Sequence, residues 1–262
     1  MKIRKIALLA ILASTMIEAK NDQYTMIIPF ESAKIAEKQL GWLEFFHSKN
    51  TLNNTSILSE WGAKGDSALV NNMGLDNSTI PKGPIDAASI GTLSMTSNSL
   101  SNVDFMINVS HLKNLDLTDN LLLSNINGLK NIKTADSVVL KNTSVSDLSP
   151  LSGLTSAKNL DFSNTKISSL NGLQNLRDIG GLILLSKYDN LKDISGLINL
   201  NSTNIPGGLG YIIFPGSRYP LIDINTPFCQ GLKSRKIRAY KGADVGGQIL
   251  INIIDHEHLC TK

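Results

Sequence analysis

Residues 160–167 read Leu-Asp-Phe-Ser-Asn-Thr-Lys-Ile, and this arrangement of apolar and polar positions recurs through the middle of the chain. An apolar residue opens each copy, and a second apolar residue follows two positions later. The openers are Leu93, Leu115, Val138, Leu160 and Leu182, so the pattern returns every 22 or 23 residues. Because several positions recur in phase, a chance run of leucines explains the pattern poorly. Self-similarity at this period predicts a solenoid of stacked coils.

The recurring apolar positions have distinct physical roles. On a short strand, the opener and the residue two positions later point the same way, toward the core. Further apolar positions return the chain along the far side, and in the fourth copy these are Ile167, Leu170, Leu173 and Leu176. The predicted fold is therefore an α/β solenoid of the leucine-rich-repeat class, with short parallel strands on its concave face. One extra residue near 121–123 and two between 185 and 191 are expected on loops.

A polar residue stands five positions after each opener: Asn98, Asn120, Thr143, Thr165 and Lys187. The chain bends inward at this point, where backbone groups would otherwise lack partners. A buried side chain that both donates and accepts hydrogen bonds satisfies these groups from coil to coil. Lysine cannot accept, so we expect Lys187 to break the ladder or to turn outward.

The repeats also resemble a known family. The stretch at 160–167 and the stretch Ser-Val-Ser-Asp-Leu-Ser-Pro-Leu at 144–151 are similar to the 22-residue repeats of bacterial internalin-type leucine-rich-repeat proteins. The resemblance covers roughly residues 70–214. It implies a curved solenoid with parallel strands on the concave face, turns or 3₁₀ segments on the convex face, and a helical cap in front. The chain departs from larger family members in having few repeats and no visible immunoglobulin-like domain or cell-wall anchor.

Residues 1–19 have the pattern of a secretory signal peptide. Lys2, Arg4 and Lys5 give a positive end, and residues 6–13 give an apolar segment too short to span a membrane. An uncleaved anchor is the alternative. No later segment has about 18 unbroken apolar residues, so we expect no membrane span after signal removal. The mature chain is predicted to begin near Lys20 and to be exported to the periplasm, the cell surface or the medium.

Residues 20–262 are predicted to form a single leucine-rich-repeat domain. Its first part, 20–90, would be an N-terminal cap with an amphipathic helix at about 31–48, followed by a degenerate coil containing Met73, Leu75, Ser78 and Ile80. A helix lying on a membrane surface is the rival interpretation, but its polar face is not strongly basic. Residues 91–214 hold the repeats, with a possible last strand at 211–214, and residues 215–262 form a C-terminal cap.

The C-terminal cap contains both cysteines of the chain, Cys229 and Cys260. In an exported protein such a pair most simply forms one disulfide, which would staple the cap. Two unrelated buried thiols are the alternative. Residues 249–254 are apolar enough for a buried strand. The basic residues Lys233, Arg235, Lys236, Arg238 and Lys241 lie between the cysteines, and a solvated turn or a weak anionic contact would account for them.

Composition and motifs give no support for catalysis. Of the 262 residues, 42% are hydrophobic and 18% charged, and the formal charge of +3 is too small to indicate a nucleic-acid partner. No serine elbow, phosphate loop or paired-carboxylate motif stands out. His256 and His258 alternate and would suit a metal site only with a third ligand, which is not evident. The sequence predicts no enzyme, no cofactor and no metal.

The concave face is the expected place of function. Its outward strand positions are small and polar and include no Trp, Tyr or Arg, the residues that dominate protein interfaces. Only at Ile183 and Leu185 does the face become apolar, so a binding site is expected toward the C-terminal end. The predicted partner-binding residues are Asp116, Val139, Lys141, Asp161, Ile183, Leu185, Tyr188 and Tyr211. The predicted function is protein–protein recognition by a monomer at or outside the bacterial envelope. The alternative is a structural or accessory component of an envelope assembly.

Overall fold

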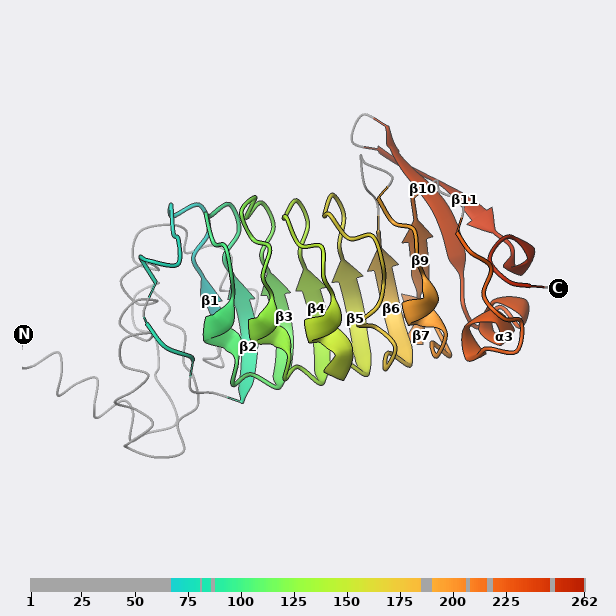
Figure 1. Ribbon diagram of the computed structural model, residues 1–262, viewed down its shortest axis with the longest axis horizontal. Helices are drawn as coiled ribbons and strands as arrows, with labels where there is room; N and C mark the ends of the chain where they lie inside the picture. The colour runs from blue at the N-terminus through green and yellow to red at the C-terminus, as the bar shows by residue number, and fades with distance from the viewer. Residues whose placement is uncertain are drawn as a thin grey trace, which may run out of the picture.

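The computed structural model describes residues 67–80, 82–85, 88–184, 190–205, 208–215, 219–245 and 248–261. Within these residues, nine strands form one sheet, in the order β1-β2-β3-β4-β5-β6-β9-β10-β11. The strands follow one another along the long axis of the molecule; a coil of chain leads from each of β2 to β5 to the next strand, whereas β10 and β11 lie side by side as an antiparallel pair (Figure 1). They are β1 (Ser67–Leu69), β2 (Ser89–Ser94), β3 (His111–Asp116), β4 (Thr134–Val139), β5 (Ser156–Asp161), β6 (Asp178–Ile183), β9 (Tyr211–Phe214), β10 (Ala239–Val245) and β11 (Gln248–Ile254).

The register of the sheet follows the sequence repeat. All neighbouring strands pair in parallel except β10 and β11, which pair antiparallel. One row of paired residues contains the five openers and then a residue of β9: Leu93, Leu115, Val138, Leu160, Leu182 and Ile212. The predicted solenoid-like arrangement is thus confirmed, and so is the last strand expected at 211–214.

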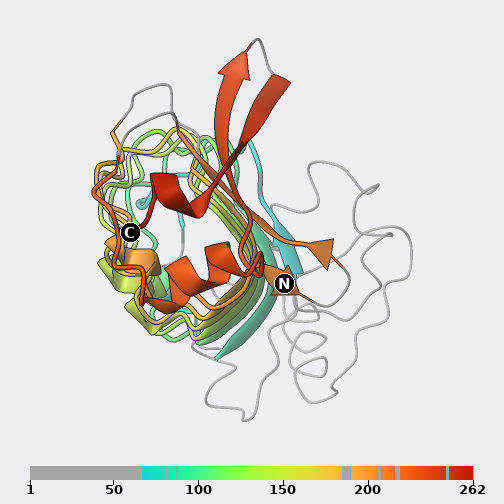
Figure 2. The ribbon, with the colours of Figure 1, turned by 90° about the vertical axis from the view of Figure 1, so that its right-hand side faces the viewer.

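The core lies inside the coils, along their common axis. Leu115 and Leu117, the opener and the residue two positions later, are both 0% exposed, and the matching residues of the other coils are also buried. Seen along the axis, the coils superpose as a ring with the sheet on one side and 3₁₀ helices on the other (Figure 2). Strand alternation therefore divides each strand into a core side and an outer side.

Short 3₁₀ helices line the side of the coils opposite the sheet. They are η2 (Asp104–Met106), η3 (Asn127–Leu129), η4 (Ser149–Gly153) and η5 (Ser195–Leu197). The coils stack closely here, because a Cβ on Gly128 or Gly196 would lie only 1.7 or 1.8 Å from a carbonyl oxygen of the preceding coil. Glycine at these two positions is therefore a packing requirement.

The polar ladder is present, but its two residue types act differently. Asn98 Oδ1 accepts hydrogen bonds from the Met73 and Leu75 backbone, and Asn120 Nδ2 donates to Met95 O, so each asparagine ties its own coil to the one before. The threonine hydroxyls of Thr143 and Thr165 donate only within their own coils, to the carbonyl three residues earlier. The threonine chain is too short to reach the preceding coil, so the ladder is continuous only in the first coils.

The expected first coil exists, but its predicted register is wrong. Ala68 pairs with Leu93, so Ala68 is the opener and Val70 is the second core residue. The apolar pair at Met73 and Leu75 follows the bend instead, where both backbone amides donate to Asn98. The signal peptide, the helix at 31–48 and Lys187 lie outside the described residues. No helix in the described part of the chain is long and apolar enough to cross a membrane.

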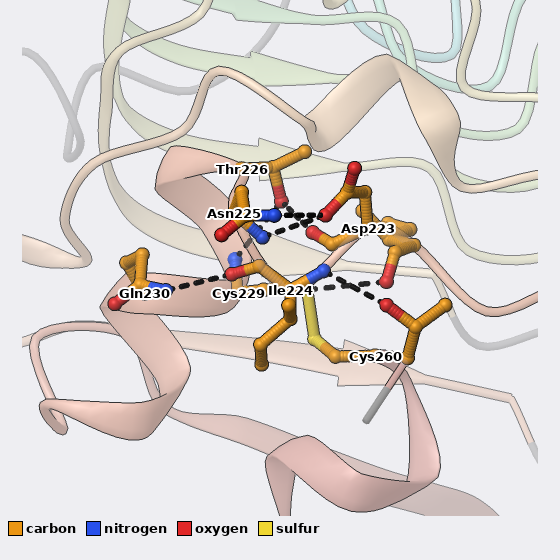
Figure 3. Close-up of a disulfide and its surroundings, with 9 residues drawn as sticks. Asp223, Ile224, Asn225, Thr226, Cys229, Gln230 and Cys260 are labelled. Atoms are coloured by element: carbon orange, nitrogen blue, oxygen red, sulfur yellow. Dashed lines mark hydrogen bonds between the residues drawn. A yellow bond between two sulfur atoms is a disulfide. The ribbon is translucent and has the colours of Figure 1, made fainter.

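The C-terminal cap is built around the predicted disulfide, which joins Cys229 and Cys260 (Figure 3). Cys229 lies on α3 (Pro227–Lys233), whose first turn is capped by the Thr226 hydroxyl. The segment before α3 pairs with the chain end, since Ile222 N donates to Leu259 O and Ile224 N donates to Thr261 Oγ1. Phe228 and both cysteines are buried, so the cap closes the end of the core.

Two expectations for this cap need correction. A strand is present at 248–254, but it is not wholly buried, because Ile253 is 76% exposed on the last strand of the sheet. His256 and His258 lie on a 3₁₀ helix, η6 (His256–His258), and not on one face of a strand. Of the basic residues between the cysteines, Lys233, Arg235, Lys236 and Lys241 are exposed, and Arg238 is half-buried.

Candidate functional site

The outer face of the sheet, turned away from the core, carries most of the predicted binding residues. We call its middle line of paired residues the central row, and the line beside it the adjoining row. The central row is Ser94, Asp116, Val139, Asp161, Ile183, Ile213, Tyr240 and Ile253. The adjoining row is Thr92, Asn114, Ser137, Asn159, Gly181 and Tyr211. Each residue in a row is paired with the next.

The central row becomes apolar at its C-terminal end. Ile183, Ile213, Tyr240 and Ile253, which we call the apolar row, lie on four neighbouring strands. Ile183 and Tyr240 are half-buried, Ile213 is buried, and Ile253 is largely exposed. With strands about 4.8 Å apart, the apolar row is roughly 15 Å long. Such a line of apolar side chains on an outer face is a feature of recognition surfaces.

Tyr211 stands beside the apolar row and packs over a glycine. A Cβ on Gly181 would lie 3.4 Å from Tyr211 Cζ and 3.4 Å from Asn159 Oδ1, so the ring lies against the Gly181 backbone. Asn159 is itself fixed by a hydrogen bond from its Nδ2 to the Ser137 hydroxyl. The ring is half-buried and backed by strand β6, which makes it a rigid aromatic group at the surface.

The N-terminal part of the face is polar, and its side chains largely bond to the protein itself. Asp116 and Asp161 accept hydrogen bonds from the backbone amides of Thr118 and Ser163, two residues on. Asn114 Nδ2 donates to the Thr92 hydroxyl. A group already satisfied by its own chain gains little by binding a partner. We therefore assign Asp116 and Asp161 a structural role at the ends of their strands.

Charged residues accompany the polar part of the face. Lys158 Nζ lies 2.9 Å from Asp136 Oδ2, one position before the adjoining row, and this ion pair is largely exposed. Lys141 is exposed two positions beyond Val139. Exposed pairs contribute little stability, so these charges are better suited to orienting a partner than to holding one.

A two-stranded hairpin rises beside the apolar end. It consists of β7 (Asn204–Ile205) and β8 (Gly208–Leu209), and it interrupts the strand that begins at Ser202 and resumes at Tyr211. Figure 2 shows this orange hairpin pointing away from the coils on the side of the sheet. Its base is closed by the buried Thr203 hydroxyl, which donates to Gly210 O and accepts from Arg238 N. The sequence suggested only a break in the repeat here.

The structure brings some of the predicted residues together and separates others. Ile183 and Tyr211 lie on adjacent strands, because Gly181 pairs with Tyr211 and Ile183 with Ile213. Val139 is next but one to Ile183 in the central row, while Lys141 lies outside both rows. Leu185 and Tyr188 lie outside the described residues.

Sequence reasoning missed Tyr240, Ile253 and Arg238. Tyr240 and Ile253 join the central row because β10 pairs with β9 and then with β11, while Arg238 precedes Ala239, the partner of Ile212. The alternation of apolar Ile237 and Ala239 with the more polar Arg238 and Tyr240 was a usable sequence signal for a strand. In the structure Ile237 and Ala239 are buried, and Arg238 and Tyr240 are half-buried. The expectation of a solvated turn or a weak anionic contact for the basic residues does not place this tyrosine and this arginine on the face.

Nothing on this face indicates bond-making chemistry. The described residues include no group of three or more His, Cys, Asp or Glu side chains that could hold a metal ion. Hydrogen bonds from the Ser78 hydroxyl and backbone lower the pKa of Asp76. Partial burial would raise the pKa of Asp193, but hydrogen bonds from Ser195 and Ser169 outweigh it and lower the value. Both carboxylates lie in the turns between strands, where they order the backbone.

Neither a protein-family model nor a curated protein matches this chain.

Proposed function

We propose that this chain is an exported leucine-rich-repeat protein that recognises another protein through the C-terminal part of its outer sheet face. The repeat class is supported by the period of 22 or 23 residues, by the buried asparagines at the strand ends and by the 3₁₀ segments opposite the sheet. On this interpretation the outer face is the concave face of the internalin-type fold.

The apolar row carries the proposal. Interfaces depend on a few aromatic or aliphatic anchors, with tyrosine and arginine enriched among them. Tyr211 supplies such a residue on the strand beside Ile183, and Tyr240 and Arg238 supply two more on the following strand segment. The polar half of the face, whose groups bond largely within the protein itself, would then form the rim of the binding site.

Export is supported by two features. The disulfide between Cys229 and Cys260 is of a kind that persists in oxidising compartments outside the cytosol. The first residues have the charge and apolar pattern of a signal peptide. Together they favour a partner at or beyond the cell envelope.

The test compares capture of partners by the oxidised chain and by variants. Envelope and secreted fractions are passed over the immobilised protein, and the captured protein is identified, purified and titrated directly. Ile183→Asp and Tyr211→Ala should each weaken binding by roughly 30-fold or more, as expected for anchor residues. Leu121→Asp is the matched control, because Leu121 is 68% exposed in a turn outside the sheet.

The outcomes separate the proposals. Loss of binding in the face variants alone, with a transient external ligand, supports recognition by this face. Equal binding by all variants would overturn the placement of the site. A stable stoichiometric complex from the envelope fraction would favour the accessory role in an envelope assembly.

A further inference from the structure

The sheet ends in an open strand with an unusual composition. β11 is the last strand in the sheet, and among the described residues its backbone hydrogen bonds go only to β10. Its sequence is Gln-Ile-Leu-Ile-Asn-Ile-Ile, without a charged residue, proline or glycine over seven positions. The neighbouring β10, which is paired on both sides, carries Lys241 and Asp244.

Exposed sheet edges are normally protected against pairing with other chains. Charged side chains, proline, bulges or very short strands are the usual means, because unpaired N–H and C=O groups are a template for another strand. β11 has no charge or proline and is longer than the strands before β10. Ile253 is also 76% exposed, at the end of the apolar row. A strand of this length and composition is suited to pairing with another strand along its free edge.

We propose that a second copy of this chain covers the edge, through antiparallel pairing of β11 with β11 about a two-fold axis near Ile251. This register would place Ile253 of each copy opposite Ile249 of the other, and Asn252 opposite Leu250. No like charges would meet, since the strand has none. The outer faces of the two sheets would then be continuous across the axis.

Self-pairing is favoured over an unrelated strand because this register sets Ile249 against Ile253 and Ile251 against itself, and it brings no charged side chains together. A two-fold contact also closes at two copies, because each copy has one β11 edge. Pairing of seven residues buries less than the roughly 1,200–2,000 Å² of a standard interface, so the dimer should be reversible, with a Kd on the order of micromolar. This replaces the expectation of a monomer and does not rest on the proposed function.

The test measures molecular mass by sedimentation over a wide range of micromolar concentrations, using the full chain produced with its own leader and an oxidised disulfide. The wild type should pass from monomer to dimer as concentration rises. Ile253→Lys places a charge on the edge at an exposed position and should weaken the dimer at least tenfold. Asn252→Lys should do the same from the opposite face of the strand, which separates loss of edge pairing from loss of the apolar row.

Leu121→Lys is the matched control, since it makes the same kind of change at an exposed apolar residue far from β11 in the chain, and it should dimerise as the wild type does. Thermal unfolding of each variant establishes that it is folded. Amide exchange within β11 should slow as the wild type dimerises. A wild type that stays monomeric, a folded Ile253→Lys variant that dimerises normally, or a mass that grows beyond two copies would each overturn the proposal.

Discussion

Single side chains at the strand ends hold successive coils together. Asn120 is fully buried, donates to Met95 O and Leu117 O, and accepts from Leu100 N. Its neighbours in the ladder show what a shorter side chain does, because Thr143 reaches only the carbonyl of Leu140. The link between coils therefore depends on which of the two residue types stands at this position.

Replacing Asn120 should reveal this difference in stability. We expect Asn120→Ala to lower the free energy of unfolding by about 2–3 kcal/mol, because the Leu100 amide is left buried without a partner. Asn120→Thr should cost less, since a hydroxyl can still bond within its own coil. Urea unfolding measures both. Asn108→Ala, at an exposed turn, should change stability by no more than about 0.5 kcal/mol. Equal losses for alanine and threonine would contradict the argument.

The residue before each of the first four ladder positions has a constrained backbone conformation. Ser97, Asp119, Asn142 and Asn164 all have φ between 54° and 62°. Asn142 Nδ2 donates to Asp119 Oδ1, and Asn164 Nδ2 donates to Asn142 Oδ1, so these side chains form a second ladder. Asparagine and aspartate are the non-glycine residues that best tolerate this conformation. The sequence contained these residues in phase, but they were not interpreted as left-handed positions.

At the scale of elements, the 3₁₀ helices begin at side chains that accept backbone hydrogen bonds. Asn125 Oδ1 accepts from Asn127 N at the start of η3, and Asp193 Oδ1 accepts from Ser195 N at the start of η5. Asp193 Oδ2 also accepts from the Ser169 hydroxyl of the preceding coil. The Asn125 amide and the Asp193 carboxylate thus accept equivalent hydrogen bonds in different coils. Only the contribution of the carboxylate should depend on pH.

The Asp193 carboxylate should make stability depend on pH. Its pKa is lowered in the folded chain, so its contribution is fully present above the ordinary pKa and is lost as pH falls through the lowered folded value. The difference in unfolding free energy between wild type and Asp193→Asn should therefore shrink as pH falls below about 4. Chemical denaturation at several pH values measures this. A difference that stays constant down to pH 2 would show that the charge is not involved.

The disulfide should stabilise the C-terminal cap strongly for its size. The cysteines are 31 residues apart, and closing a loop of this length is worth about 3.5–4 kcal/mol in the chain-entropy model. We expect the double variant Cys229→Ser, Cys260→Ser to lose roughly this amount, first in α3 and η6. Hydrogen exchange resolves where the loss occurs, and Ser152→Ala, at an exposed site in the third coil, serves as control. If protection from exchange were lost equally along all strands, the disulfide would stabilise more of the molecule than the cap.

Over the whole molecule, stability should follow position along the stack. Each coil contacts mainly its two neighbours, so the middle strands are supported on both sides and the outer ones on one. We expect amides of β3, β4 and β5 to exchange most slowly and those of β1 and β11 fastest, measured at low protein concentration. Uniform exchange rates along the sheet would contradict this prediction.

The sequence predicted the parts of the molecule that repeat and missed the parts that do not. Leu93 and Leu115 were assigned correctly because the same physical demand recurs in every coil. The first coil was misplaced because its core residues Ala68 and Val70 are small, while Met73 and Leu75 imitate the pattern. Tyr240 lies on the outer face because β10 pairs with β9, and the sequence repeat does not predict this pairing. The predicted residues Ile183 and Tyr211 lie at the C-terminal end of the outer face, and the structure adds Tyr240 to that end.

The hairpin formed by β7 and β8 has a consequence for how such a surface can diversify. Thr203 and Gly210 hold its base, and the pairing of Ser202 with Asp178 and of Tyr211 with Gly181 continues on either side. Residues 204–209 are thus inserted between two parts of one strand, and the residues on either side keep their pairing register with β6. Changes in the length or sequence of this segment would reshape the border of the proposed recognition surface while leaving the scaffold intact. It is the natural place to graft a new specificity, by selection or by design.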